Sequence, residues 1–118
     1  MSTDDCIFCR IGRFEDVERG RVIVDLPSTY IMEPLNPVTP GHVLVIPRAH
    51  VASATEDPEV TSQVMKVAAT HAQEVGDCNI ITSVGLLASQ TVMHLHIHVV
   101  PRREGDGLAL PWGKLKED

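Results

Sequence analysis

Three histidines alternate with apolar residues in the segment His94-Leu95-His96-Ile97-His98-Val99-Val100. Successive side chains of a strand point to opposite faces, so this spacing predicts that the three imidazoles share one face and that the apolar residues point towards the core. Imidazoles spaced at ~7 Å would repel one another if all were protonated, so at least some should be neutral near pH 7. A neutral imidazole is both a nucleophile and a metal ligand.

Two kinds of chemistry are compatible with this pattern. In the first, His94 and His96 ligate a catalytic zinc ion as a His-x-His pair, which requires a third ligand and an open position for water. In the second, one imidazole attacks phosphorus directly. A purely structural role is disfavoured because three histidines alternate strictly.

A second group with possible chemistry is the pair Cys6 and Cys9, which has the two-residue gap of a zinc knuckle. The pair alone is a weak signal, because a complete zinc site needs two further ligands. Two free thiols or a redox pair are the alternatives, although the thioredoxin-like βαβ context of a redox pair is missing. Cys78 has no nearby partner in the sequence and is interpreted as a small core residue.

The elements that must position these side chains follow from hydrophobic periodicity. A helix is predicted from Asp57-Pro58 to Gly76, and a rigid Pro- and Gly-containing loop at 36–41. Strands are predicted at 21–24, 29–32, 42–47, 79–84 and 93–100. Strands grouped before and after one long helix favour an α+β domain with a largely antiparallel sheet over a doubly wound parallel sheet.

Size and charge narrow the function further. The 118 residues are 43% hydrophobic, enough for a single domain over 1–118, with a charged C-terminal tail at 102–118. A net charge of −6 and an aromatic content of 3% argue against nucleic-acid binding, which needs a basic face or stacking platforms. No signal peptide or membrane span is evident, so a cytoplasmic protein without membrane partners is expected.

The histidine segment resembles the signature of the histidine-triad (HIT) superfamily, H-φ-H-φ-H-φ-φ with φ apolar. The resemblance extends to 40–47 with its exit Arg48-Ala49-His50, and to the entry Gln90-Thr91-Val92-Met93-His94, and it covers roughly residues 6–101. It implies a HIT-like single domain of the α+β class, with a mainly antiparallel five-stranded sheet and one long helix.

The resemblance also implies a reaction. His96 would attack the α-phosphorus of a nucleoside conjugate, with a purine as the expected base, and form a covalent nucleotidyl-histidine that water resolves. His98 and His42 would orient the nucleophile or assist the leaving group. The expected enzyme is a HIT-type nucleotide hydrolase, a phosphoramidase or a dinucleoside polyphosphate hydrolase, with no catalytic cofactor.

Substrate-binding positions are carried over in the same way. Gln90 and Thr91 would donate hydrogen bonds to phosphate oxygens. The full expected set is Ser83, Ser89, Gln90, Thr91, His96 and His98.

A structural zinc is a further implication, because some HIT proteins hold one with a Cys-x-x-Cys pair and two histidines. The corresponding residues here are Cys6, Cys9, His50 and His94. A closed four-ligand site has no open position for water, so this zinc would be structural and would leave His96 free.

The sequence departs from the family pattern where many members carry an Asp that binds the ribose. Pro34 stands at that position, and the adjacent Glu33 would point to the opposite face of a strand. The retained His98 makes a nucleotidylyltransferase less favoured than a hydrolase. The alternatives are a non-catalytic nucleotide-binding regulatory protein of HIT fold and a zinc-dependent hydrolase, and a homodimer is expected by resemblance.

Overall fold

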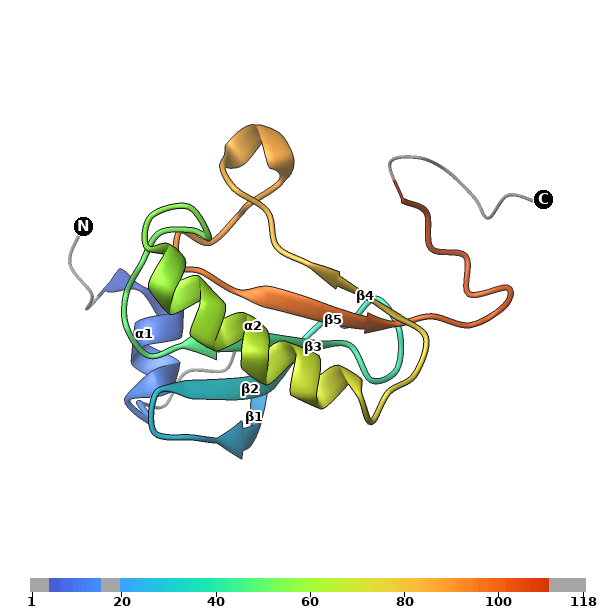
Figure 1. The fold of residues 1–118 in the computed structure, drawn as a ribbon, viewed down its shortest axis with the longest axis horizontal. Coiled ribbons are helices and arrows are strands. Elements are labelled where there is room, and N and C mark those ends of the chain that lie inside the picture. The colour runs from blue at the N-terminus through green and yellow to red at the C-terminus, as the bar shows by residue number, and fades with distance from the viewer. Residues whose placement is uncertain (1–4, 16–19, 111–118) are drawn as a thin grey trace.

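The computed structural model describes residues 5–15 and 20–110, and its centre is one antiparallel sheet (Figure 1). The five strands of the described residues run in the order β1-β2-β3-β5-β4. Their bounds are β1 (Gly20–Asp25), β2 (Thr29–Pro34), β3 (Val43–Pro47), β4 (Cys78–Ile81) and β5 (Ile97–Pro101). The helices are α1 (Ile7–Gly12), α2 (Pro58–Ala72) and the short 3₁₀ helix η2 (Leu86–Ala88). The predicted α+β class, antiparallel sheet and single long helix are therefore confirmed. The C-terminal tail beyond Leu110, with Trp112, lies outside the described residues.

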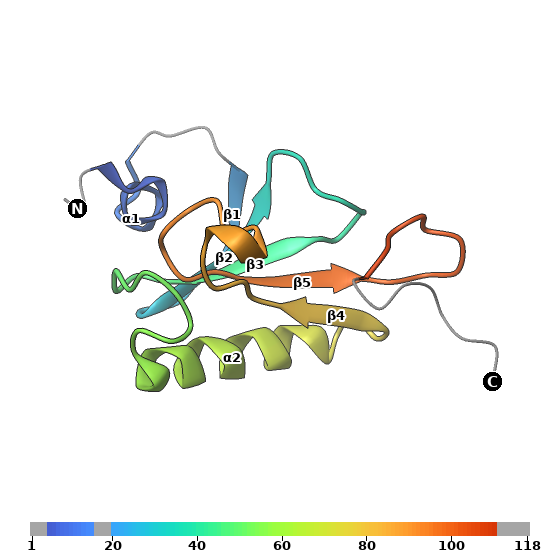
Figure 2. The ribbon, with the colours of Figure 1, turned by 90° about the horizontal axis from the view of Figure 1, so that it is seen from above.

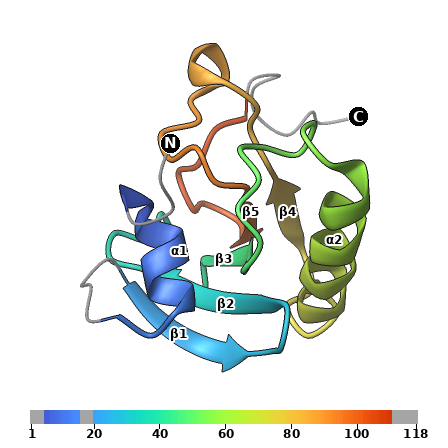
Figure 3. The ribbon, with the colours of Figure 1, turned by 90° about the vertical axis from the view of Figure 1, so that its left-hand side faces the viewer.

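The two α-helices lie on opposite faces of the sheet, as Figures 2 and 3 show. Strand β3 is buried throughout, and its side chains pack on both faces of the sheet. Val43 and Val45 pack in the cluster that contains Val64 of α2. Leu44 and Ile46 pack in the cluster that contains α1. Each face of the sheet thus has its own core, and none of the described helices is both long and apolar enough to cross a bilayer.

Helix α2 begins as its sequence predicts. The side chain of Asp57 accepts hydrogen bonds from the backbone N–H groups of Glu59 and Val60, and Pro58 occupies the first turn. The helix ends at Ala72, earlier than the predicted end at Gly76.

The strand that carries the histidines is shorter than predicted. Strand β5 begins at Ile97, so His98 lies within it while His94 and His96 precede it. The chain before β5 is instead held by a backbone hydrogen bond outside the sheet, in which the Leu95 N–H donates to the carbonyl oxygen of Val51 at 2.8 Å. Strand β4 likewise ends at Ile81, before the predicted end at 84.

Candidate active site and metal cluster

The environment of His96 fixes which ring nitrogen is free. Its Nδ1 lies 2.8 Å from the carbonyl oxygen of His94, and because a carbonyl only accepts, Nδ1 carries the proton in the neutral ring. The Nε2 lone pair is therefore left for a substrate. Burial lowers the pKa of His96 below its usual value and thus favours this neutral form. The ring of Phe8 packs edge-on against the imidazole at 5.1 Å between centroids.

A chain of hydrogen bonds also assigns the protons of His42 and His98. The backbone N–H of Val38 donates to Nδ1 of His42 at 3.1 Å, so the proton of neutral His42 is on Nε2. That Nε2 lies 3.0 Å from Nδ1 of His98. His98 must accept there, which places its own proton on Nε2.

The electrostatics keep this histidine pair uncharged. Burial, followed by the neighbouring His96 and His42, lowers the pKa of His98 to about 4. Burial also lowers the pKa of His42. The centroids of the His96 and His98 rings are 5.2 Å apart, so the ring with the free Nε2 lone pair neighbours the ring that carries its proton on Nε2.

The predicted phosphate-binding residues are distributed around this centre. Ser83 and Ser89 line a cavity of about 330 Å³ together with His42 and His98. Thr91 is exposed.

Gln90 has partners other than the phosphate oxygens expected for it. It is buried, and its Nε2 donates to the carbonyl oxygens of Ala52 and Val92 at 2.6 and 3.0 Å. Its Oε1 accepts from the backbone N–H of Gly85 at 2.8 Å. Gln90 therefore shapes the loop that carries the serine and threonine hydroxyl groups.

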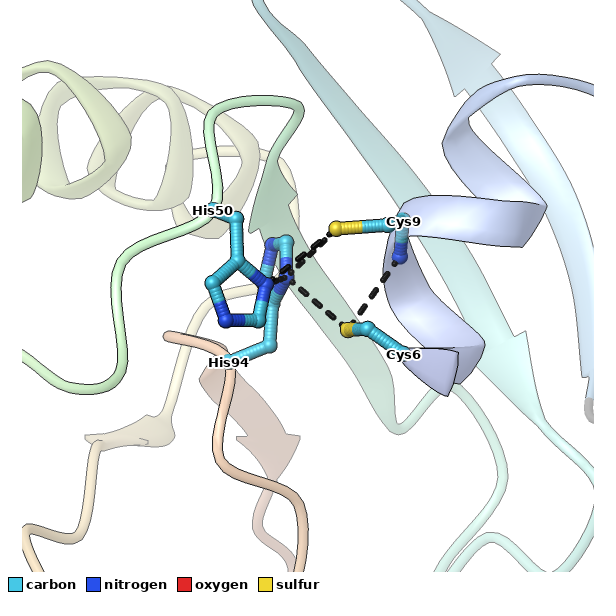
Figure 4. A group of neighbouring side chains, drawn as sticks. All are labelled: Cys6, Cys9, His50 and His94. Carbon is cyan, nitrogen blue, oxygen red and sulfur yellow. Dashed lines mark hydrogen bonds between the residues drawn. The ribbon is translucent and has the colours of Figure 1, made fainter. Parts of the chain in front are cut away.

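The four predicted metal ligands come together at the start of α1, where Figure 4 shows their side chains pointing towards one another. Their ligand atoms lie within 4.8 Å of one another. Nδ1 of His94 is 3.3 Å from Sγ of Cys6 and 3.2 Å from Nδ1 of His50, which is 3.2 Å from Sγ of Cys9. Ligands of a tetrahedral zinc with bonds of about 2.0–2.3 Å are about 3.3–3.8 Å apart. The donor set and its spacing therefore fit this ion.

A second hydrogen bond orients His94 for this role. Its Nε2 lies 2.7 Å from the carbonyl oxygen of Pro47, so Nε2 carries the proton and the Nδ1 lone pair faces the cluster. Burial raises the pKa of the Cys9 thiol to about 11, with Cys6 adding to the effect. Two thiolates can therefore share this buried cluster only beside a positive charge.

Among the described residues, neither the position of the expected ribose-binding Asp nor its neighbour offers a free carboxylate. Pro34 ends β2 without a polar side-chain atom. The carboxylate of Glu33 is paired with Arg21 at 2.8 Å.

Sequence reasoning missed Phe8, which connects the two sites. Its ring also lies 5.9 Å from that of His94, and the hydroxyl of Tyr30 donates to its carbonyl oxygen at 2.6 Å. The available signal was a large apolar side chain between two potential metal ligands.

Comparison with known proteins places these features in a family. The model of the HIT domain family matches residues 15–105. An adenosine 5'-monophosphoramidase of Saccharomyces cerevisiae is 30% identical over 96% of this chain and 73% of its own length.

Two solved structures share the fold. A HIT family hydrolase from Clostridium thermocellum superposes with a TM-score of 0.76 and 28% identity, covering 88% of this chain and 96% of its own. A zinc-bound histidine triad family protein from Mycobacterium smegmatis superposes with a TM-score of 0.78 and 33% identity, covering 92% and 82%.

Proposed function

The chain belongs to the HIT domain family, and from this premise we propose that it is a nucleotide-processing hydrolase with His96 as its nucleophile. The bond cleaved would be a phosphoramide or phosphoanhydride bond at the α-phosphorus of a nucleoside conjugate, with a purine as the expected base. The observation that carries the proposal is the His96 ring, whose Nδ1 donates to a backbone carbonyl and whose Nε2 lone pair is free. The relative that is an adenosine 5'-monophosphoramidase supports the choice of substrate class.

In the first step, Nε2 of His96 bonds to phosphorus while the bond to the leaving atom breaks, and the electron pair departs with that atom. The phosphorylated ring becomes an imidazolium, which the carbonyl oxygen of His94 stabilises through Nδ1–H. The Nε2–H of His98 hydrogen-bonds to the leaving atom. A nitrogen leaving atom also gains one proton, which is taken up from solvent.

In the second step, water attacks phosphorus, the bond to His96 breaks, and one proton is released to solvent. The cycle is therefore balanced in protons. Ser83, Ser89 and Thr91 donate to the phosphate oxygens as negative charge builds on them. Gln90 contributes by holding the loop of Ser89 and Thr91.

We infer a structural zinc ion on Cys6, Cys9, His50 and His94. It would supply a cross-link between α1 and the segment before β5, and with four protein ligands it would leave no position for substrate. The zinc-bound relative from Mycobacterium smegmatis supports this inference. Metal analysis after zinc-supplemented expression tests it, and fewer than about half an equivalent would contradict it.

The experiment that tests the reaction is hydrolysis of adenosine 5'-phosphoramidate by the wild type and by His96→Ala, with a chelator present. A matched control is His71→Ala, which removes a histidine on α2 outside the site. We expect turnover by the wild type and the control and a loss of more than 10³-fold in His96→Ala. Acid quenching followed by intact-mass measurement should reveal a nucleotidyl adduct on the wild type. Equal activity of the His96 variant would refute the assignment of the nucleophile.

A second candidate function is nucleotide binding without turnover, and the absence of a free carboxylate at Pro34 and Glu33 favours it. A rise in melting temperature with AMP, without hydrolysis of any conjugate, would identify this function. Activity that a chelator abolishes would instead support the zinc-dependent hydrolase. The homodimer and the cytoplasmic location remain predictions, and light scattering tests the first.

A further inference from the structure

A cavity lies beside His98, the residue that faces the leaving atom in the proposed reaction. Its lining includes His98, whose Nε2–H faces a leaving atom in the proposed reaction, and also Val38 and His42, which fix that proton. The volume of about 330 Å³ is at the lower end of the range of small-molecule sites. A group attached to the α-phosphorus could occupy it.

Half of the residues that line this cavity are aliphatic, and the proposed phosphate donors Ser83 and Ser89 line it too. Its apolar lining includes Val38, Ile81, Val100, Leu108 and Leu110. These side chains come from the loop before β3, from β4 and β5, and from the segment that follows β5. They offer a surface for methylene groups and no hydrogen bonds for a charged chain.

The described lining of the cavity also lacks a free positive charge. Among the described lining residues the one cation is Arg102, and four of its five N–H donors are engaged. Two bind the carboxylate of Asp106 at 2.8 and 3.2 Å, one binds Oδ1 of Asn79 at 2.7 Å, and one binds the carbonyl oxygen of Leu108 at 2.8 Å. Asp106 cancels the charge of the guanidinium, so no described lining residue would neutralise a polyphosphate.

We propose that this cavity binds an uncharged, apolar leaving group, so that the substrates are nucleoside phosphates joined to an apolar organic chain. This inference rests on the proposed hydrolase function and narrows its substrate class. A polyphosphate or an anionic leaving group would be disfavoured, because its charge would be removed from water without compensation.

A series of adenosine 5'-phosphoramidates tests the proposal in the wild type. The amines are ammonia, propylamine, hexylamine and 6-aminohexanoate, the last of which has a carboxylate in place of the terminal methyl group of hexylamine. We expect kcat/KM to rise about threefold to fourfold per methylene until the cavity is filled. The terminal carboxylate should lower kcat/KM at least about tenfold relative to hexylamine.

A charge placed in the cavity should reverse this preference. Leu110→Lys introduces a cation into the lining, and Leu87→Lys is the matched control, because Leu87 is fully exposed on η2 and lies outside the lining. We expect Leu110→Lys to lower the ratio of kcat/KM for hexylamine to that for 6-aminohexanoate about tenfold, and Leu87→Lys to leave it unchanged.

The outcomes separate this inference from the proposed function. Hydrolysis of all four compounds without dependence on chain length or charge would overturn the assignment of the cavity and leave the hydrolase standing. An equal effect of both lysine variants on the ratio would also overturn it. If none of the four compounds is hydrolysed, the phosphoramidase form of the proposed function fails and the cavity assignment fails with it.

Discussion

The proton on Nε2 of His98 depends on a single neighbouring donor, the Nε2–H of His42. Replacing His42 with Phe keeps a flat ring in this buried position and removes the donor. Nδ1 of His98 then has no partner, and the alternative tautomer, with the proton on Nδ1, is no longer excluded. In that tautomer Nε2 carries a lone pair and cannot donate a hydrogen bond to the leaving atom.

The size of the effect follows from the burial of the pair. Leaving a buried acceptor without its hydrogen bond costs about 1–3 kcal/mol. If this penalty appears fully in the transition state, kcat for an adenosine phosphoramidate falls about 5- to 150-fold. KM should change little, because the lost interaction concerns the leaving atom and not the bound nucleotide.

The assay is steady-state hydrolysis at saturating substrate, with His42→Gln as the matched variant. The Gln amide can donate to Nδ1 of His98, so His42→Gln should recover part of the kcat that His42→Phe loses. A wild-type kcat in His42→Phe would refute the tautomer argument. Equal losses in both variants would show that His42 acts through packing instead of through its proton.

Three further predictions follow from the same geometry. Because the pKa of His98 is lowered to about 4, the unfolded chain binds more protons than the folded one between that pH and the usual value, so stability should fall as pH drops below about 6.5. Urea unfolding at pH 7 and pH 5 should show a smaller difference in His98→Gln than in the wild type. Cys9→Ser should lose bound zinc and about 3 kcal/mol of unfolding free energy, by analogy with the loss of a long-range cross-link, with Cys78→Ser as the control. Phe8→Leu keeps an apolar side chain but loses the ring contact with His96, so kcat should fall about 2- to 13-fold, and an unchanged kcat would contradict a positioning role.

Much of the fold could be predicted because the spacing of apolar residues along the chain indicates which side chains are buried. The apolar run that forms β3 is buried on both faces, and the capping pattern at Asp57 located the start of α2. The start of β5 could not be predicted in this way. The alternating pattern continues through His94 and His96, but the chain there is held by a bond to Val51, which lies far away in sequence.

The sequence proposed the residues of the candidate site but not their proton positions. The alternating triad pointed to His96 and His98, the family resemblance added His42, and the structure brings the three rings together. Their tautomers depend on the backbone N–H of Val38 and the carbonyl oxygen of His94. Nearly every residue carries such backbone groups, so the sequence does not show which of them will bind a histidine ring. Helix α1 is only six residues long, too short for periodicity to reveal it.

The cluster of Cys6, Cys9, His50 and His94 also limits the order in which parts of the protein can fold. Cys6 lies 88 positions before His94, so the contact between them closes a loop that contains most of the chain. Closing a flexible loop of that length carries an entropic penalty that grows to about 4 kcal/mol, and no local contact offsets it early in folding. During synthesis, the N-terminal cysteines leave the ribosome long before their histidine partner exists. The contacts around His96 are therefore completed late, because a chain interrupted before His94 lacks the histidines of the candidate active site.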